Sequence, residues 1–207
     1  MNSRMLYSLE YAASKPCLLA ISYAPDSVMS DESINLKRLA QMDPRAVAEV
    51  HDRYFAELFR YARYRVSSPD VAEDIVSDVF VRLLEAVGGG KTPHTNLRGW
   101  LLSTCSNAVN DYFRRIYRHD VAELAESVAE DSPGPVSILD NQEDRAELQA
   151  ALAQLTPDQQ HVVALRFGAG CTLRETATLM GRRVNAVKAL QFRAIQALRR
   201  QMSVDQS

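Results

Sequence analysis

The segment TLRETATLMGRRVNAVKALQFRA, residues 172–194, constrains the fold more strongly than any other part of the chain. Its first four residues, TLRE, have the pattern of a capping box, in which a threonine and a glutamate satisfy the free backbone groups of a helix start. Gly181 readily takes the left-handed conformation of a sharp turn, and Ala177 is small where two helices must cross closely. A short helix, a tight turn and a longer helix over about 185–202 therefore predict a helix-turn-helix.

The longer helix of this motif has an apolar side and a polar side at helical spacing. We expect its apolar side to face the core: Val184, Val187, Ala194, Ile195 and Leu198. We expect its other side to be exposed: Lys188, Ala189, Phe192, Arg193 and Gln196. Cations on such a helix can neutralise DNA phosphates, and its side chains can read base edges in the major groove. The simpler interpretation is a solvated helix face, but the capping box and the glycine turn favour DNA binding.

The formal net charge of -2 is an average over segments of opposite charge. Arginine and lysine dominate residues 155–200, which open with a second capping box at Thr156. Acids dominate residues 119–150, which have Pro-Gly-Pro in the middle. We interpret the acidic segment as a flexible linker with a helix at its end, and the basic segment as a separate domain.

The front half of the chain is predicted to be helical as well. Strand signals are weak, and apolar residues recur at helical spacing from about residue 36 onward. Asp-Pro, Ser-Ser-Pro and Gly-Gly-Gly breaks predict helices over about 44–66, 70–87 and 97–118. The first two should bury these side chains: Val47, Val50, Tyr54, Leu58, Tyr61, Val71, Ile75, Val79, Leu83 and Val87. The fold class is therefore all-α, with two small helical domains joined by an acidic linker.

Several classes of protein do not fit the sequence. The three cysteines, Cys17, Cys105 and Cys171, are too far apart to suggest a zinc site or a disulfide framework, so a reducing cytoplasm is the default. No apolar run is long enough for a membrane span. The run at 17–24 would be marginal as a secretory signal and no clear cleavage site follows it, so we assign it to the N-terminal extension. Catalytic motifs are lacking, and the scattered histidines are interpreted as surface residues. We expect no catalytic residue, metal or cofactor.

Three segments of the chain resemble one family in their order and spacing. AEDIVSDVFVRLLEAV and LRGWLLSTCSNAVNDYFRR resemble region 2 of the extracytoplasmic-function (ECF, group 4) sigma factors of bacterial RNA polymerase, in the sigma-70 family. LTPDQQHVVALRFGAGCTLRETATLMGRRVNAVKALQFRAIQALRR resembles their region 4. The resemblance implies this division of the chain: an N-terminal extension over 1–35, region 2 over 36–118, the acidic linker over 119–150, region 4 over 151–202 and a tail over 203–207.

The resemblance also implies a function and partners. A cytoplasmic protein of this family would bind core RNA polymerase and direct promoter-specific initiation. Region 2 would dock on the β′ clamp helices and melt the minus-ten element, and region 4 would bind the minus-thirty-five element and the β flap. The resemblance leaves an anti-sigma partner open.

Site residues follow from the resemblance, position by position. For polymerase binding they are Asp74, Ser77, Asp78 and Arg82. For the minus-ten element they are Trp100, Asn107, Tyr112, Arg114 and Arg115, where an amide suits a flipped base and Trp100 is more simply a core aromatic. For the minus-thirty-five element they are Arg174, Arg182, Arg183, Asn185, Lys188, Ala189, Phe192 and Arg193.

The sequence departs from the family after Lys188. Ala189 and Leu190 stand where the family often has serine and arginine, and Gln191 stands where an inward apolar residue is usual. Leu190 would either take over core packing or contact a thymine methyl group. The departures leave the promoter sequence open.

Two other functions compete with this one. The same helix-turn-helix pattern occurs in transcriptional regulators of the response-regulator type, but the alternating strands of a receiver domain are not visible in the front half. A helical adaptor that binds only polypeptides is the third interpretation, which salt-dependent DNA binding would distinguish.

Overall fold

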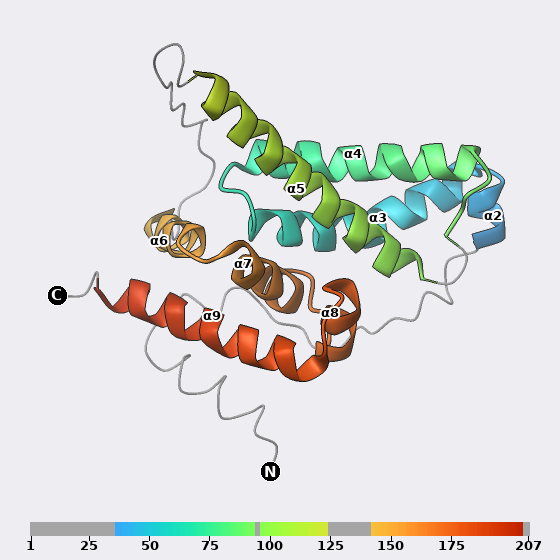
Figure 1. Ribbon diagram of the computed structural model, residues 1–207. Coiled ribbons are helices and arrows are strands. Elements are labelled where there is room, and N and C mark those ends of the chain that lie inside the picture. Colours follow the sequence, from blue (N-terminus) through green and yellow to red (C-terminus); the bar gives the residue numbers. More distant parts are fainter. Residues whose placement is uncertain (1–35, 94–95, 124–141, 205–207) are drawn as a thin grey trace.

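The computed structural model describes residues 36–93, 96–123 and 142–204, and these ranges form helices without a strand (Figure 1). The predicted all-α class is confirmed. An N-terminal bundle consists of α2 (Leu36–Ala40), α3 (Pro44–Arg63), α4 (Pro69–Gly88) and α5 (Leu97–Glu123). A C-terminal bundle consists of α6 (Gln142–Ala153), α7 (Pro157–Val163), the π-helix η3 (Ala164–Gly168), α8 (Leu173–Leu179) and α9 (Val184–Val204).

Local capping explains where four of these helices begin. The Asp43 carboxylate caps α3, and the Ser68 hydroxyl caps α4 by accepting the backbone N–H of Val71. Both predicted capping boxes are present, at Thr156 and at Thr172. Each satisfies backbone groups that a helix start leaves free.

The turn of the helix-turn-helix forms as predicted, since Gly181 has φ +61. Several helix limits differ from the predictions, including the end of α3, which is at Arg63 rather than near residue 66. The structure ends α5 at Glu123 rather than near Arg118, and it begins α9 at Val184 rather than Asn185. The helix from Thr156 changes at Ala164 into a π-helix, which sequence periodicity did not indicate.

The core of the N-terminal bundle contains most of the predicted side chains. Val47 and Val71 are the exceptions, because they are only half-buried at its edge. Apolar residues of α5 complete the core, and the buried Arg65 donates a hydrogen bond of 3.1 Å to the side chain of Asn110. This bond ties the end of α3 to the middle of α5.

The C-terminal bundle has a smaller core. Val187, Leu190 and Ala194 of α9 are buried there against α6 and α7. Leu190 is only 7% exposed, so it takes the core role of its two expected roles. Val184, Ile195 and Leu198, also expected in the core, are half-buried.

The two bundles pack directly against each other, with α7 lying between α9 and α3 (Figure 1). Ala164, Leu165, Ala169 and Cys171 of the C-terminal bundle belong to the core of the N-terminal bundle. Gly168 lies close to α3, where an added Cβ would come within 3.1 Å of the Arg60 carbonyl oxygen and of the Tyr61 Cα. The packing therefore favours a glycine at this position.

Three further expectations concern the cysteines, metal binding and membrane spans. Cys105 and Cys171 are buried free thiols, and Cys17 lies outside the described residues. In the part of the chain that the structure describes, no group of side chains could hold a metal ion. None of the helices there combines the length and the apolar character that a bilayer crossing needs.

Candidate nucleic-acid and protein interfaces

The outer side of α9 presents the predicted reading residues to solvent. Asn185, Lys188, Ala189, Phe192 and Arg193 are all exposed, and 56% of Phe192 is accessible. They lie opposite the buried residues of the same helix, which recur at three- and four-residue spacing and fix the rotation of α9. A cationic side with an exposed aromatic ring is suited to a DNA groove.

The turn before α9 adds more cations. Arg174, Arg182 and Arg183 are exposed and line a shallow hollow around Gly181. Arg182 also donates to the Asp158 carboxylate at the start of α7, over 2.6 Å. The sequence did not predict this pair, since nothing local relates two residues so far apart in the chain.

Gln191 departs from the family pattern for a reason that the structure makes plain. Its side-chain oxygen accepts a hydrogen bond of 3.1 Å from Arg166 of η3, which also donates to the Cys171 carbonyl oxygen. Gln191 therefore satisfies a half-buried guanidinium, which an apolar side chain at this position could not do.

The candidate minus-ten residues lie along α5. Asn107, Arg114 and Arg115 are exposed, whereas Trp100 and Tyr112 are half-buried and pack against the core. The tryptophan therefore has the core role that was the simpler interpretation. From Trp100 to Arg115 these residues extend over about 22 Å of helix.

The end of α5 carries an apolar surface that the sequence analysis missed. Phe113, Ile116 and Tyr117 are exposed, Tyr117 by 72%, and they alternate with Arg114, Arg115 and Arg118. The sequence could have indicated this surface, because these apolar residues continue along the predicted helix beyond the residues that contact the core. Aromatic rings beside arginines are suited to stacking on unpaired bases.

The candidate polymerase-binding residues form a polar stripe on α4. Asp74, Ser77 and Asp78 are exposed, and the half-buried Arg82 pairs with Asp78 at 2.8 Å, one helical turn away. Such an exposed pair contributes little to stability. The stripe is therefore free to exchange its internal pair for partners on another protein.

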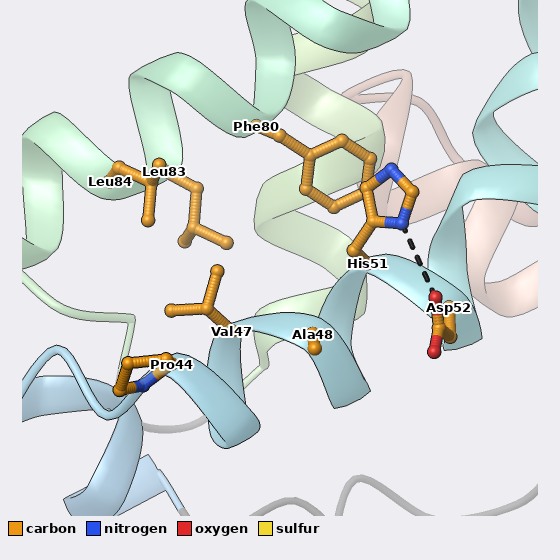
Figure 2. A pocket seen from close by; sticks show the side chains of 8 residues that line it. All are labelled: Pro44, Val47, Ala48, His51, Asp52, Phe80, Leu83 and Leu84. Carbon is orange, nitrogen blue, oxygen red and sulfur yellow. Dashed lines mark hydrogen bonds and ion pairs between the residues drawn. The ribbon is translucent and has the colours of Figure 1, made fainter.

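An apolar groove of about 360 Å³ lies between α3 and α4 (Figure 2), and Phe80 in its wall is one helical turn from Ser77 of the stripe. Val47 and His51 line it from α3, and Phe80 and Leu84 line it from α4. The His51 ring lies 4.8 Å from the Phe80 ring. The groove was not predicted, because Val47 was expected to be in the core.

A polar cluster seals the contact between the bundles. Arg98 of α5 pairs with Glu57 of α3 at 2.7 Å and with Glu175 of α8 at 2.9 Å. Its guanidinium also donates to the Ala169 carbonyl oxygen at 2.8 Å and to the Cys171 sulfur at 3.7 Å. Burial raises the pKa of the Glu57 carboxyl in spite of the nearby arginine.

His161 lies in the same contact, and its interpretation as a surface residue is wrong. Its ring meets Tyr61 edge-on with centroids 6.0 Å apart, and its Nε2 lies 3.4 Å from the Ser106 hydroxyl oxygen. Burial, together with the nearby Arg65, lowers the pKa of the imidazole to about 4. The ring is therefore neutral at pH 7.

Comparisons with known proteins agree with this geometry. Family models match residues 50–119 as Sigma-70 region 2 and residues 151–200 as Sigma-70, region 4. The ECF RNA polymerase sigma factor BldN of Streptomyces coelicolor is 33% identical over 184 residues, which cover 87% of this chain and 68% of BldN. The ECF RNA polymerase sigma factor SigX of Bacillus subtilis is 27% identical over 161 residues, covering 75% of this chain and 82% of SigX.

A solved structure has a similar fold. The sigma factor RpoE in complex with the anti-sigma factor NepR, from Bartonella quintana, matches with a TM-score of 0.58 and 22% identity. The match covers 76% of this chain and 98% of that one. At this identity the likeness concerns the fold.

Proposed function

Because the chain belongs to the ECF RNA polymerase sigma factors of the sigma-70 family, we propose that each of its two bundles binds one promoter element. The family consists of transcription initiation factors, which direct the polymerase and catalyse no reaction of their own. The C-terminal bundle would bind the minus-thirty-five element, and the N-terminal bundle would bind core RNA polymerase and the minus-ten element. Such a protein would act in the cytoplasm.

The observation that carries this proposal is the exposed side of α9. Lys188 and Arg193 lie on it with Phe192, while Val187, Leu190 and Ala194 hold the opposite side in the core. A helix held this way can enter a major groove and bring its side chains to base edges. Arg174 and Arg183, exposed beside the turn, would contact the flanking phosphates.

The side of α5 that carries Asn107 supports the minus-ten assignment. The exposed amide of Asn107 offers both a donor and an acceptor to the edge of an unstacked base. Arg114 and Arg115, which are also exposed, would hold phosphates of the separated strand, and Tyr117 adds an aromatic surface beyond them.

For core polymerase we infer a docking surface on α4. The polar stripe of Asp74, Ser77, Asp78 and Arg82 offers charged partners, and the adjoining groove offers apolar contact to helices such as those of the β′ clamp. We also propose that the C-terminal bundle contacts the β flap of the polymerase. The RpoE protein was solved with an anti-sigma factor, and we infer a regulator of that kind for this chain.

Run-off transcription tests the proposed function. Purified chain would be added to core RNA polymerase and a pool of genomic DNA fragments, and the transcripts would be sequenced. We expect co-elution with the core enzyme and initiation at a shared pair of promoter elements. A chain that neither co-elutes nor supports any transcript would contradict the proposal.

The same assay separates the alternatives. A helical adaptor would co-elute without supporting transcripts, and it would show no salt-dependent binding to DNA. A regulator of the response-regulator type would bind a promoter alone but would not replace a sigma factor, and the region 2 match over residues 50–119 disfavours it.

A further inference from the structure

The core of the C-terminal bundle determines which side of α9 faces inward, but it determines the rotation of the helix only to within the width of that side. Beside its buried residues, the inner side of α9 has three that are half-buried: Val184, Ile195 and Leu198. Apolar contacts are non-directional, so a broad apolar side tolerates a small rotation about the helix axis. A directional contact is needed to restrict this rotation further.

A small rotation of α9 matters because Lys188 and Phe192 would read base edges. A rotation of about 20° moves a side-chain end that lies about 5 to 6 Å from the helix axis by about 2 Å. Hydrogen bonds to base edges require donor–acceptor distances of about 2.7 to 3.2 Å, and functional side chains are typically held to within about 0.5 Å. Sequence recognition by α9 therefore depends on how tightly its rotation is fixed.

A directional contact lies at the edge of the apolar side of α9. The Nε–H of Arg166, in η3, donates to the side-chain oxygen of Gln191 at 3.1 Å, and both side chains are half-buried. Gln191 follows Lys188 by three positions and directly precedes Phe192, so it borders the reading side of the helix. The hydrogen bond therefore joins the reading helix to an element that lies 25 positions earlier in the chain.

The guanidinium of Arg166 is itself held in place. Its Nη1 donates to the carbonyl oxygen of Cys171, which directly precedes Thr172, the N-cap residue of α8. Cys171 is buried, and its backbone N–H donates to the Leu165 carbonyl oxygen at 2.8 Å. Because a guanidinium is planar and rigid, contacts at two of its nitrogens fix its orientation. Arg166 therefore holds η3, the start of α8 and the edge of α9 in one arrangement.

The π-helix η3 supports a functional role for this arrangement. The backbone N–H of Ala169 donates to the carbonyl oxygen of Ala164, five positions earlier, at 2.9 Å. Such a bond widens the turn and changes the directions of its side chains relative to an α-helix, and π turns are frequent at functional sites. In η3, Leu165 and Ala169 share the core of the N-terminal bundle, whereas Arg166 reaches α9.

We propose that the hydrogen bond between Arg166 and Gln191 sets the rotation of α9, and that Gln191 is a positioning residue for sequence recognition by Lys188 and Phe192. The proposal rests on the proposed function, in which α9 enters the major groove of the minus-thirty-five element. Since the side-chain oxygen of Gln191 is bound by Arg166, Gln191 acts through the helix and not on a base. Loss of the bond should therefore change the preference between sequences more than the general affinity for DNA.

Three variants separate the effect of this bond from direct contacts with DNA. Gln191→Leu removes the acceptor at similar side-chain size, and Arg166→Met removes the donor but keeps an apolar stem. Gln191→Glu keeps an acceptor for Arg166 and removes the amide donor that a direct base contact would use. The matched control is Gln201→Leu, the same substitution at an exposed position of α9 about 12 Å beyond Arg193. Circular dichroism checks the helical content of each, and if either Gln191→Leu or Arg166→Met fails to fold, the other still tests the proposal.

The first measurement is the discrimination between DNA sequences. The full chain would be titrated with the minus-thirty-five duplex found by run-off transcription and with duplexes changed at one base pair each. We expect Gln191→Leu and Arg166→Met to lower the ratio of the two dissociation constants about five- to tenfold at the same base pairs. Their combination should lower it no further, because both substitutions remove one interaction. Gln191→Glu and Gln201→Leu should discriminate as the parent does.

Three results of this titration would overturn the positioning role. Gln191→Leu could discriminate as well as the parent, or the losses could add in the combined variant. Gln191→Glu could lose as much discrimination as Gln191→Leu, which would mean that the amide contacts a base directly. Arg166→Met could weaken all sequences alike, which would mean that this arginine only holds a phosphate.

The second measurement needs no DNA. The Nε–H signal of Arg166 in the nuclear magnetic resonance spectrum can be assigned by its loss in Arg166→Met. Its proton should exchange with water more slowly in the parent and in Gln191→Glu than in Gln191→Leu. Equal exchange rates would overturn the hydrogen bond itself. If the parent prefers no sequence, the proposed function fails and the positioning role with it, and the exchange rates still decide whether the bond exists in the free protein.

Discussion

Among single residues, Arg182 differs from Lys188 and Arg193 because it has a carboxylate partner within its own bundle. It pairs with Asp158 at 2.6 Å, whereas Lys188 and Arg193 lie on the exposed side of α9. An exposed ion pair is worth less than about 1 kcal/mol, so DNA phosphates can replace the carboxylate. Arg182 should therefore contribute to general affinity, and the other two should contribute to sequence preference.

Titration of variants against minus-thirty-five duplexes tests this division. Lys188→Ala and Arg193→Ala should each cost about 1 to 3 kcal/mol and relax the preference at one base pair. Arg182→Ala should weaken all sequences alike and reduce the salt slope by about one unit. The control Asp158→Asn should leave sequence preference unchanged and strengthen general binding. If all three cation variants lose affinity uniformly, another side of α9 faces the groove.

The neutral ring of His161 makes the stability of the folded protein depend on pH. Burial lowers its pKa to about 4, below the ordinary value of 6.5, so the folded state disfavours the proton that the unfolded chain accepts. Arg65, Asp158 and Arg182 are the charged groups that act on it. Stability should therefore be full above pH 6.5 and should fall by at most about 2 to 3 kcal/mol as the pH approaches 4.

Urea unfolding between pH 7.5 and pH 4.5 measures this dependence. The control His161→Gln keeps a polar side chain of similar reach that does not titrate, so its stability should change less over the same range. The carboxylates titrate in both proteins, so their contribution to the pH dependence cancels in the comparison. Identical pH profiles for the two proteins would show that His161 is accessible to solvent.

For the element α4, the polymerase-binding prediction concerns a whole helix side. Asp74→Ala combined with Asp78→Ala removes two exposed carboxylates and releases Arg82 from its pair. Loss of charges that pair across an interface should cost about 2 to 5 kcal/mol of binding to core polymerase. The double variant should keep its helical content by circular dichroism, because neither side chain is in the core.

A matched double variant controls for net charge. Glu73→Ala with Glu85→Ala removes the same number of exposed acids from the same helix but leaves the stripe intact. It should bind core polymerase nearly as the parent does. If both double variants lose affinity equally, the effect is one of overall charge and not of the stripe.

Helix starts and turns could be predicted from the sequence because their causes are local. Thr156 and Thr172 make their capping boxes with residues three positions away, and Gly181 needs only its own backbone freedom. Burial was predicted less well at the edge of a face, where Val47 lines a groove instead of joining the core. Periodicity predicts which side of a helix is apolar, but it does not predict which element packs over each part of that side.

The π-helix and the joining of the bundles could not be predicted, because they depend on residues far apart in the chain. Gly168 ends η3, and its close approach to Arg60 and Tyr61 depends on α3, which lies far from it in the chain. Likewise the contacts of Arg98 with Glu57 and Glu175 exist only after the bundles meet. The sequence did predict two helical units and their order. This order was enough to recognise the family, although the packing of the two units in space was not predicted.

At the scale of the whole molecule, the shared core should make the two bundles unfold together. Leu165, Ala169 and Cys171 would be exposed to water if either bundle unfolded alone, which couples their stabilities. We therefore expect one thermal transition for the parent, with the same midpoint by circular dichroism and by the fluorescence of Trp100.

Gly168→Ala should separate this transition into two. Forcing a methyl group into a packed contact typically costs about 1 to 3 kcal/mol, and each kcal/mol lowers the midpoint by about 2 to 4 °C in a chain of this size. The bundle with the smaller core should then melt first, so the midpoints by the two probes should diverge, because Trp100 reports only the N-terminal bundle. The control Gly88→Ala, whose added Cβ has no atom within 4 Å, should retain a single transition. Two transitions already present in the parent, and unchanged in Gly168→Ala, would mean that the bundles fold independently and that their contact adds no stability.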